Sequence, residues 1–149
     1  MRDIALIWDP ANGRADFAIE NGDLKMDEGL RTSLIVSLFC DRLADVSDKI
    51  PDGSGDRRGW WGDTPPAIDS NGIDLTGSKL WLLPALQADT TLRFAESYVR
   101  QAVQWMIDDG IADSVVPVAT FPARGRIQIS TTIRQGAAST VYDLAWGAT

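Results

Sequence analysis

The feature that most constrains the fold of this sequence is a long amphipathic segment at about residues 90–109. Its apolar residues recur three and four positions apart: Leu92, Ala95, Val99, Ala102 and Met106. This spacing places them on one face of an α-helix, and Gly110 stands where a glycine commonly ends one. A helix of about 20 residues is ~30 Å long, the width of a small domain. We therefore predict that this helix is the spine of the fold.

A second constraint is the period-two alternation that follows this helix. Alternate positions are apolar or threonine: Ile127, Ile129, Thr131 and Ile133. Such a pattern predicts an antiparallel strand with one buried face. We also predict a strand that starts at Val115, a turn at Phe121–Gly125, and a final short strand through Tyr142 and Trp146.

The N-terminal residues alternate in the same way and predict a small β-meander. Turn-forming residues at Pro10–Gly13 and Asn21–Asp23 separate its strands. Asp27 is a candidate N-cap for a first helix at about 28–44, where apolar residues again recur at three and four. These elements make an α+β chain that ends in antiparallel strands. A length of 149 residues is typical of a single domain, residues 1–149.

Residues 47–78, between the two predicted helices, fit neither pattern. Glycine, proline, aspartate and serine dominate this stretch, which includes Pro65 and Pro66. A loop of this length within one domain is uncommon, and is usually either functional or disordered. Because Trp60 and Trp61 lie side by side in it, and large aromatic side chains favour burial or contact, we predict a long ordered loop that packs on something.

The acidic charge and the absence of histidine exclude several classes of function. The net charge of −7 repels phosphate, so we predict no nucleic-acid partner. No apolar run approaches the ~20 residues that span a bilayer, so we predict no membrane insertion. Without histidine, the chain can build no Ser-His-Asp, Cys-His or histidine-based zinc site. Cys40 is the single cysteine, which suits folding in a reducing cytoplasm.

A pair of carboxylates is the remaining route to catalysis. Glycoside hydrolysis needs two carboxyl groups across a cleft, one of them protonated. The chain has three glutamates, Glu20, Glu28 and Glu96. Its aspartates fall mostly in turns and caps, where hydrogen bonds to the backbone account for them. We therefore predict no catalytic residues and no enzyme activity.

The aspartates of the loop also fit part of a calcium-binding pattern. Asp52, Ser54 and Asp56 have the spacing of the first three ligands of an EF-type loop, and Asp63 falls at its twelfth position. Arg57, however, occupies the sixth position, where that loop requires glycine for a sharp turn. We predict no bound metal and no cofactor.

The segment from Arg57 to Asp63 combines basic and aromatic side chains. Such a mixture can clamp nucleic acid, but two arginines in a chain of net charge −7 make a poor electrostatic footprint for it. Arginine and tryptophan are also enriched at the centres of protein–protein interfaces. Because neighbouring residues of an extended segment point to opposite sides, Trp60 and Trp61 divide between a core role and a partner contact, and either ring fits either role.

Three motifs together resemble a known family. They are Arg-Arg-Gly-Trp-Trp-Gly-Asp at 57–63, Gly-Ser-Lys-Leu-Trp-Leu-Leu at 77–83 and Gln-Trp-Met-Ile-Asp-Asp-Gly at 104–110. Their order resembles the Mu-type tail proteins of contractile phages and prophages, which are similar to the baseplate wedge family called gene-25-like or tail-lysozyme-like. The resemblance covers nearly the whole chain. One departure is Asp109–Ala112, which stands where that family often carries Glu-Pro-Arg.

The resemblance implies a structural subunit of the baseplate wedge, near the hub and the base of the sheath. Other wedge and hub subunits would be its partners, and it would be oligomeric only within that assembly. It would be assembled in the host cytoplasm and reside in the virion tail baseplate. The partner-binding residues that we predict belong to the first two motifs: Arg57, Arg58, Trp60, Trp61, Asp63, Lys79 and Trp81. The alternatives are a peptidoglycan-degrading tail lysozyme and a calcium-stabilised adaptor.

Overall fold

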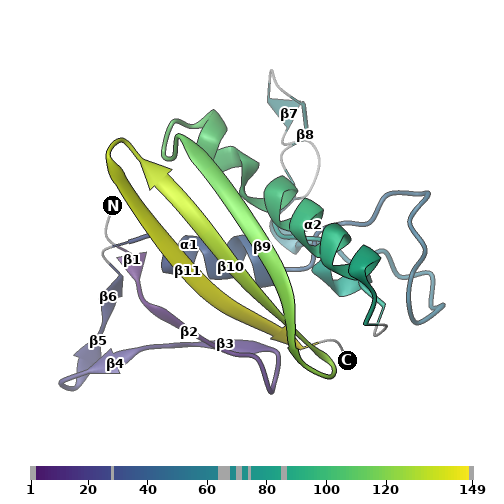
Figure 1. Cartoon of the computed structure of the whole chain (residues 1–149), viewed down its shortest axis with the longest axis horizontal. Coiled ribbons are helices and arrows are strands. Elements are labelled where there is room, and N and C mark those ends of the chain that lie inside the picture. Colours follow the sequence, from purple (N-terminus) through teal and green to yellow (C-terminus); the bar gives the residue numbers. More distant parts are fainter. Residues whose placement is uncertain are drawn as a thin grey trace.

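A three-stranded antiparallel sheet forms one layer of the molecule, and two helices form the layer behind it (Figure 1). The computed structural model describes residues 3–27, 29–63, 68–69, 72–73, 75–84 and 87–147. The strands lie in the order β11 (Ala138–Gly147), β10 (Arg126–Gln135) and β9 (Ser114–Ala123). The helices are α1 (Arg31–Phe39) and α2 (Asp89–Asp108). The predicted α+β class is confirmed.

The core lies between the sheet and the helices. The inward residues of β10 are all buried, as their alternation predicted: Ile127, Ile129, Thr131 and Ile133. From α2, the buried residues follow the predicted three-and-four spacing: Ala95, Val99, Ala102, Val103 and Met106. Leu34 and Leu38 of α1 complete the same cluster. Burial of these side chains is the main source of stability, at about 25 cal/mol per Å² of apolar surface.

Helix α2 ends as its sequence predicts. Gly110 has a φ of 69°, a left-handed conformation that glycine adopts without strain. The chain then folds back, so that the carbonyl oxygen of Met106 accepts hydrogen bonds from the N–H groups of Ile111 and Ala112, both at 2.8 Å. These bonds satisfy a carbonyl that the helix end would otherwise leave unpaired.

Helix α1 is shorter than predicted at both ends. The N-cap is Leu30 rather than the predicted Asp27, although the Asp27 carboxylate accepts the N–H of Thr32, in the first turn, at 2.7 Å and that of Gly29 at 3.0 Å. Glu28, the predicted start, lies outside the described residues. The helix stops at Phe39 because Cys40 becomes extended and its carbonyl oxygen accepts the N–H of Ser78. A long-range pairing therefore overrides the helical periodicity.

The outer strands are longer than predicted. β9 continues through the expected turn to Ala123, because the side chain of Phe121 still packs against the core. The turn occupies Arg124 and Gly125, with a φ of 74° at Gly125. β9 lies at an edge of the sheet, where prolines such as Pro117 are tolerated.

Two positions along the free edge of β9 offer no free backbone donor. Pro117 has no N–H group, and the N–H of Ala119, two residues later on the same side of the strand, donates to the carboxylate of Glu96 at 3.1 Å. Glu96 projects from α2, so the helix covers part of the edge. Gln87 also donates to the carbonyl oxygen of Ala123 at 3.1 Å.

Residues 3–27 form a separate element that we call the N-terminal arm. It contains three short ladders: β1 (Asp3–Ile4) with β6 (Met26–Asp27), β2 (Leu6–Asp9) with β3 (Arg14–Phe17), and β4 (Ile19–Glu20) with β5 (Asp23–Leu24). The antiparallel strands agree with the prediction. Their ladders meet at a closed set of backbone hydrogen bonds among Ala5, Ala18 and Lys25, each of 2.8 or 2.9 Å.

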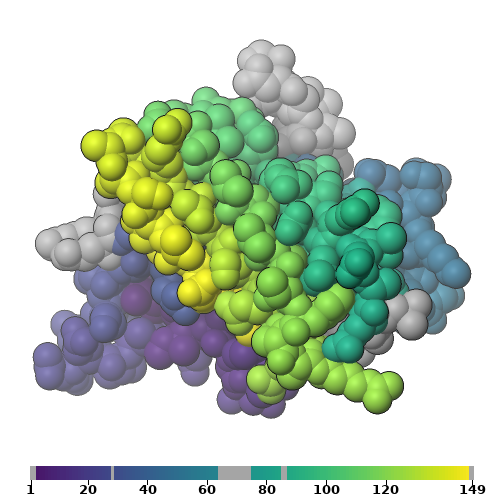
Figure 2. All heavy atoms as spheres, viewed as in Figure 1, coloured from purple at the N-terminus to yellow at the C-terminus, as the bar shows by residue number. Residues whose placement is uncertain are grey.

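The arm is attached to the body along β2. The indole Nε1 of Trp8 donates to the carbonyl oxygen of Ala145 at 2.6 Å, and its ring stacks on Phe39 with centroids 3.9 Å apart. Thr32 Oγ1 accepts the N–H of Leu6 and donates to the carbonyl oxygen of Ile4. Figure 2 shows the rest of the arm extending beyond the body.

The predicted loop 47–78 contains little regular structure within its described residues. It includes the short helix η1 (Trp61–Asp63) and the two-residue strands β7 (Ile68–Asp69) and β8 (Gly72–Ile73), and it leads to η2 (Leu80–Leu82). Pro65 and Pro66 lie outside the described residues. Among the helices of the described ranges, none has the length and apolarity needed to cross a membrane.

Candidate partner-binding site

The segment Gly77–Trp81 clamps the end of α1. A Cβ atom at Gly77 would lie 2.3 Å from the carbonyl oxygen of Cys40, and Gly77 has a φ of 93°. Both facts require glycine at this position. Ser78 is buried beside it, and its hydroxyl donates to the carbonyl oxygen of Leu38 at 2.5 Å. The second sequence motif is therefore explained by local packing.

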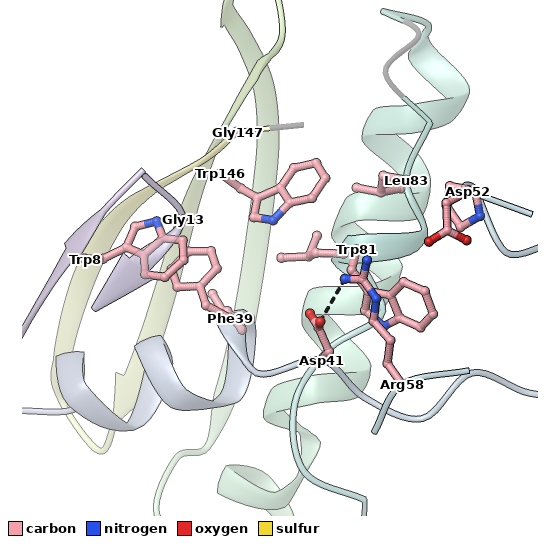
Figure 3. A pocket seen from close by; sticks show the side chains of 13 residues that line it. Trp8, Gly13, Phe39, Asp41, Asp52, Arg58, Trp81, Leu83, Trp146 and Gly147 are labelled. Atoms are coloured by element: carbon pink, nitrogen blue, oxygen red, sulfur yellow. Dashed lines mark hydrogen bonds and ion pairs between the residues drawn. The ribbon is translucent and has the colours of Figure 1, made fainter. Parts of the chain in front are cut away.

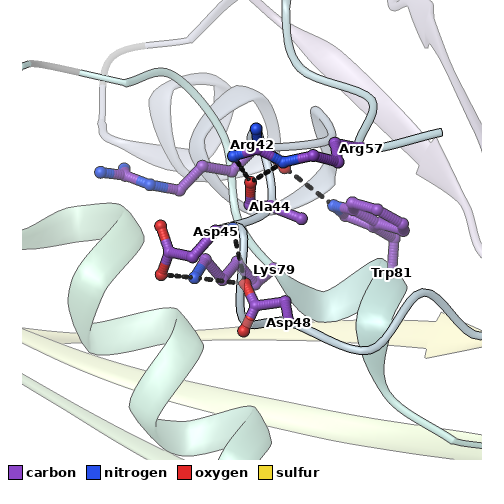
Figure 4. A network of polar contacts seen from close by, with 7 residues as sticks. All are labelled: Arg42, Ala44, Asp45, Asp48, Arg57, Lys79 and Trp81. Atoms are coloured by element: carbon purple, nitrogen blue, oxygen red, sulfur yellow. Dashed lines mark hydrogen bonds and ion pairs between the residues drawn. The ribbon is translucent and has the colours of Figure 1, made fainter. Parts of the chain in front are cut away.

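Lys79 is buried in an ion-pair network with two aspartates (Figure 4). Its Nζ lies 2.5 Å from a carboxylate oxygen of Asp45 and 2.7 Å from one of Asp48. Burial disfavours the charged ammonium, but the hydrogen bonds to the two aspartates outweigh it and hold the pKa of Lys79 above its usual value. Burial likewise opposes ionisation of Asp48, yet the bond from Lys79 holds its pKa below its usual value.

Trp81 is buried beneath the loop. Its indole Nε1 donates to the carbonyl oxygen of Arg42 at 2.9 Å, and it packs with Ala44 and Leu82 in a small buried cluster of its own. The guanidinium of Arg58 lies over the Trp81 ring, 4.4 Å from its centroid. Such a cation–π contact is worth about 0.5–1 kcal/mol at an exposed site.

The two arginines of the first motif have different roles. Arg57 turns inward, where its guanidinium donates two hydrogen bonds to the carbonyl oxygen of Ala44, and its own carbonyl oxygen accepts the N–H of that residue. Arg58 stays partly exposed and forms an ion pair with Asp41 at 2.8 Å. Arg57 thus fixes the loop, while Arg58 remains accessible to a partner.

A cleft of about 340 Å³ lies next to Arg58 (Figure 3). Its walls carry the aromatic rings of Trp8, Phe39, Trp81 and Trp146. In Figure 3, the stacked Trp8 and Phe39 lie on one side and Trp81 on the other, with Trp146 between them. Asp41 and Asp52 supply the acidic groups of the lining. Concave aromatic surfaces with a few polar groups suit the capture of apolar side chains.

The tryptophan pair of the loop is exposed. The side chain of Trp61 is 82% exposed and that of Trp60 is 41% exposed. Their ring centroids lie 5.3 Å apart at a tilt of 42°, and the Trp60 ring covers Gly62, where a Cβ would fall 2.0 Å from it. Neither ring fills the core, because Trp81 occupies the buried position beneath the loop.

The aspartates of the calcium-like pattern bind the backbone. Asp52 accepts the N–H of Ser54 at 2.9 Å, Asp56 accepts that of Arg58 at 2.9 Å, and Asp63 accepts that of Thr76 at 3.0 Å. The hydrogen bond to Ser54 lowers the pKa of Asp52. Turn formation accounts for this spacing, and the described residues include no group of three or more ligands placed for a metal ion.

None of the three described carboxylates with a shifted pKa is suited to act as a protonated general acid. Asp9, Asp48 and Asp52 have shifted pKa values, and all three are lowered. A glycosidase acid requires the opposite shift. Glu96 serves the fold, since it accepts the N–H of Ala119 and faces Arg100 at 3.6 Å. Glu28 lies outside the described residues.

Burial raises the pKa of Cys40, which keeps the thiol protonated near neutral pH.

The seven predicted partner-binding residues therefore separate into two groups. Arg58, Trp60 and Trp61 are exposed, whereas Lys79 and Trp81 are buried and make internal contacts. Arg57 and Asp63 are half-buried and hold the loop. The other aromatic residues of the cleft, Trp8, Phe39 and Trp146, were not predicted as site residues, because each also fits the apolar pattern of its strand or helix. The two tryptophans outside the motifs, Trp8 and Trp146, were the available signal.

Comparisons with known proteins add an independent line of evidence. A family model described as phage protein GP46 matches residues 30–140. The chain is 42% identical over 116 residues to baseplate protein gp46 of Escherichia phage Mu, which covers 77% of this chain and 74% of that protein. It is 38% identical over 123 residues to the Mu-like prophage FluMu protein gp46 of Haemophilus influenzae, which covers 82% of this chain and 78% of that protein.

Proposed function

We propose a structural role in a phage tail baseplate for this chain, which belongs to the phage protein GP46 family. The name of the phage Mu relative, a baseplate protein, supports this role. So does the surface of the chain, which exposes a tryptophan pair and an aromatic cleft. Both features are suited to binding other proteins.

Within the baseplate, we place the chain in the wedge, near the hub and the base of a contractile sheath. Its partners are other wedge and hub subunits, and it is assembled in the host cytoplasm before it resides in the virion. The motif resemblance supports this placement, as does an acidic chain without the basic footprint of nucleic-acid binding. The wider likeness to the gene-25-like family stays a prediction.

The partner contact is centred on Trp60 and Trp61, with Arg58 at its margin. Trp61 carries this proposal. Its side chain is 82% exposed, so a large apolar area remains in contact with water until a partner covers it. The residues beneath keep the pair in place: Arg57, Asp63, Lys79 and Trp81. Because these contacts form before association, the loop loses little conformational freedom on binding.

The chain performs this role without catalysis. A peptidoglycan-degrading lysozyme would need a protonated carboxyl group opposite a second carboxylate, and the shifted carboxylates have lowered pKa values. A calcium-stabilised adaptor would need free carboxylates, and those of Asp52, Asp56 and Asp63 accept backbone hydrogen bonds. No observation favours either alternative.

Co-expression tests this function directly. The full chain is produced with each tail protein of the same phage, and complexes are measured by size-exclusion chromatography with light scattering. We expect a stable complex for the wild type and its loss in Trp60→Ala/Trp61→Ala. Circular dichroism establishes that the variant is folded.

Phe94→Ala is the matched control, because Phe94 is an exposed aromatic residue outside the loop. We expect it to bind as the wild type does. A wild-type chain that remains monomeric beside every tail protein would refute the proposed function. Cell-wall lysis by the wild type would favour the lysozyme.

A further inference from the structure

The N-terminal arm presents an apolar face to solvent. Phe17 and Ile19 lie two residues apart in one extended segment, so their side chains share a face. Leu24 and Met26 do the same in the segment that pairs with it. Ile19 and Leu24 are directly paired across the ladder, which places all four side chains on the same face. Their exposed fractions lie between 43% and 65%.

This apolar face continues from the core. Leu6 is paired with Phe17 and therefore shares its face, and Leu6 packs against the core cluster. The apolar surface therefore starts at Leu6, which packs against the core, and continues along the arm to side chains that are exposed. A neighbouring protein that covered the exposed part would extend the existing core, and an apolar patch of this kind marks an interaction site.

The charge of the arm decides which occupant fits. Residues 3–27 contain six acidic side chains and two basic ones, a net charge of −4 within a chain of −7. Asp16 and Asp23 form no ion pair with any described residue and only accept the N–H of the next residue. A second copy of the same arm would therefore meet like charge. Asp16 and Asp23 lie on the face opposite the apolar patch, so a groove that encloses the arm, apolar against the patch and basic along the opposite face, complements it.

We propose that the N-terminal arm docks into such a groove, apolar on one side and basic on the other, on a different baseplate subunit. This inference rests on the proposed function and adds a second contact to it. The β4–β5 end of the arm and the loop lie on opposite sides of the body (Figure 1), although Trp8 and Gly13 of the arm line the same cleft as Arg58 of the loop. The chain therefore bridges two neighbours, one bound by the loop and one by the arm.

The structure of the arm suits this task. The hydrogen bonds among Ala5, Ala18 and Lys25 close its centre, and Trp8 holds its base on the sheet. Because the apolar face exists before association, little ordering entropy opposes binding. The arm has two charged pairs, Arg14 with Asp9 at 3.9 Å and Lys25 with Glu20 at 3.0 Å. The second lies on the face opposite Ile19 and Leu24, where it does not interrupt the apolar surface.

The test uses the full chain and the co-expressed tail proteins of the same phage. Ile19→Ser/Leu24→Ser removes the central apolar pair of the arm. Val116→Ser/Val141→Ser is the matched control, because these valines are similarly exposed on the open face of the sheet. We expect the Kd of one complex to rise about tenfold or more in the arm variant, and to stay within about twofold in the control.

A second variant tests the charge. Asp16→Asn/Asp23→Asn keeps an acceptor for the local N–H bonds and removes two charges. We expect the wild-type Kd to rise when NaCl is increased from about 50 to about 300 mM, because salt screens the attraction. The variant should show a smaller rise. This variant keeps the apolar face, so it remains informative if the serine variant fails to fold.

The outcomes separate this inference from the proposed function. If Trp60→Ala/Trp61→Ala breaks a complex while both arm variants bind as the wild type does, the function stands and the inference is overturned. If the isolated chain dimerises through Ile19 and Leu24, the occupant is a second copy and the inference is also overturned. If the wild type binds no tail protein, the proposed function fails and the inference fails with it.

Discussion

Arg58 lies over the indole ring of Trp81, with its guanidinium carbon 4.4 Å from the ring centroid, and it pairs with Asp41 at 2.8 Å. Trp81 in turn donates its indole N–H to the carbonyl oxygen of Arg42. One arginine therefore joins three segments: the loop, the chain after α1 and the buried η2. The exposed Trp60 and Trp61 follow Arg58 within three residues, so their position depends on this contact.

We expect Arg58→Gln to lower the free energy of unfolding by about 1 kcal/mol, through loss of the cation–π contact and a partly exposed ion pair. Amide hydrogen exchange at residues 57–63 should accelerate. Arg58→Lys keeps a cation and should show a smaller effect on both measurements. Equal effects of Gln and Lys would show that the planar guanidinium, rather than its charge, holds the loop.

Gly77→Ala should be strongly destabilising, because its methyl group would lie 2.3 Å from the carbonyl oxygen of Cys40. We expect a loss of about 3 kcal/mol or more, from backbone strain together with the displaced pairing. Gly53→Ala is the matched control, with a φ of 68° and no atom within 4 Å of its added methyl, and should cost about 1 kcal/mol. Urea unfolding measures both. Similar losses would contradict the clamp at Gly77.

The ion pairs of Lys79 should stabilise the fold over a defined range of pH. The folded pKa of Lys79 is raised above its usual 10.5, so its contribution is complete below pH 10.5 and is lost as pH rises through the folded value. The folded pKa of Asp48 is lowered below its usual 3.8, so its contribution is present above pH 3.8 and is lost as pH falls through the folded value.

Lys79→Met isolates this effect. It leaves Asp45 and Asp48 without their shared cation, and we expect a loss of about 2 kcal/mol near pH 7, less than for a fully buried pair because Asp45 is largely exposed. Denaturant unfolding across the pH range should show a difference between wild type and variant that shrinks at both extremes. A difference independent of pH would assign the loss to packing.

Thr131 offers a stabilising substitution. Its side chain is fully buried on the inner face of β10, and its hydroxyl has no hydrogen-bond partner within the part of the chain that the structure describes. Thr131→Val replaces the hydroxyl with a methyl group of similar size. We expect a gain of about 1 kcal/mol in the free energy of unfolding, since a buried unsatisfied polar group is costly. Thermal unfolding is the measurement, and a lower Tm would mean that the hydroxyl is satisfied in solution.

Local periodicity predicted the elements whose packing agrees with it. α2 and β10 follow their apolar spacing closely, and Gly110 ends α2 as expected. The end of α1 was not predictable in this way, because Cys40 pairs with Ser78, 38 residues later. The pattern of one segment holds no information on a partner that distant.

The candidate site shows the same limit. The motifs pointed to residues that matter for the loop, and the resemblance to Mu-type baseplate proteins is confirmed by the family match and the phage Mu relative. Motifs did not distinguish exposed Trp61 from buried Lys79, whose partners Asp45 and Asp48 precede it by more than 30 residues. The cleft was missed because Trp8 and Trp146 come from opposite ends of the chain.

The partly protected edge of β9 has a consequence for the self-association of the chain. A strand with unpaired N–H groups recruits identical strands and grows into fibres. Here Pro117 offers no donor, and Glu96 occupies that of Ala119. An approaching strand therefore finds no free donor at these two positions, although the chain displays apolar side chains elsewhere. Edge-to-edge pairing of identical copies is thereby disfavoured along the middle of this strand.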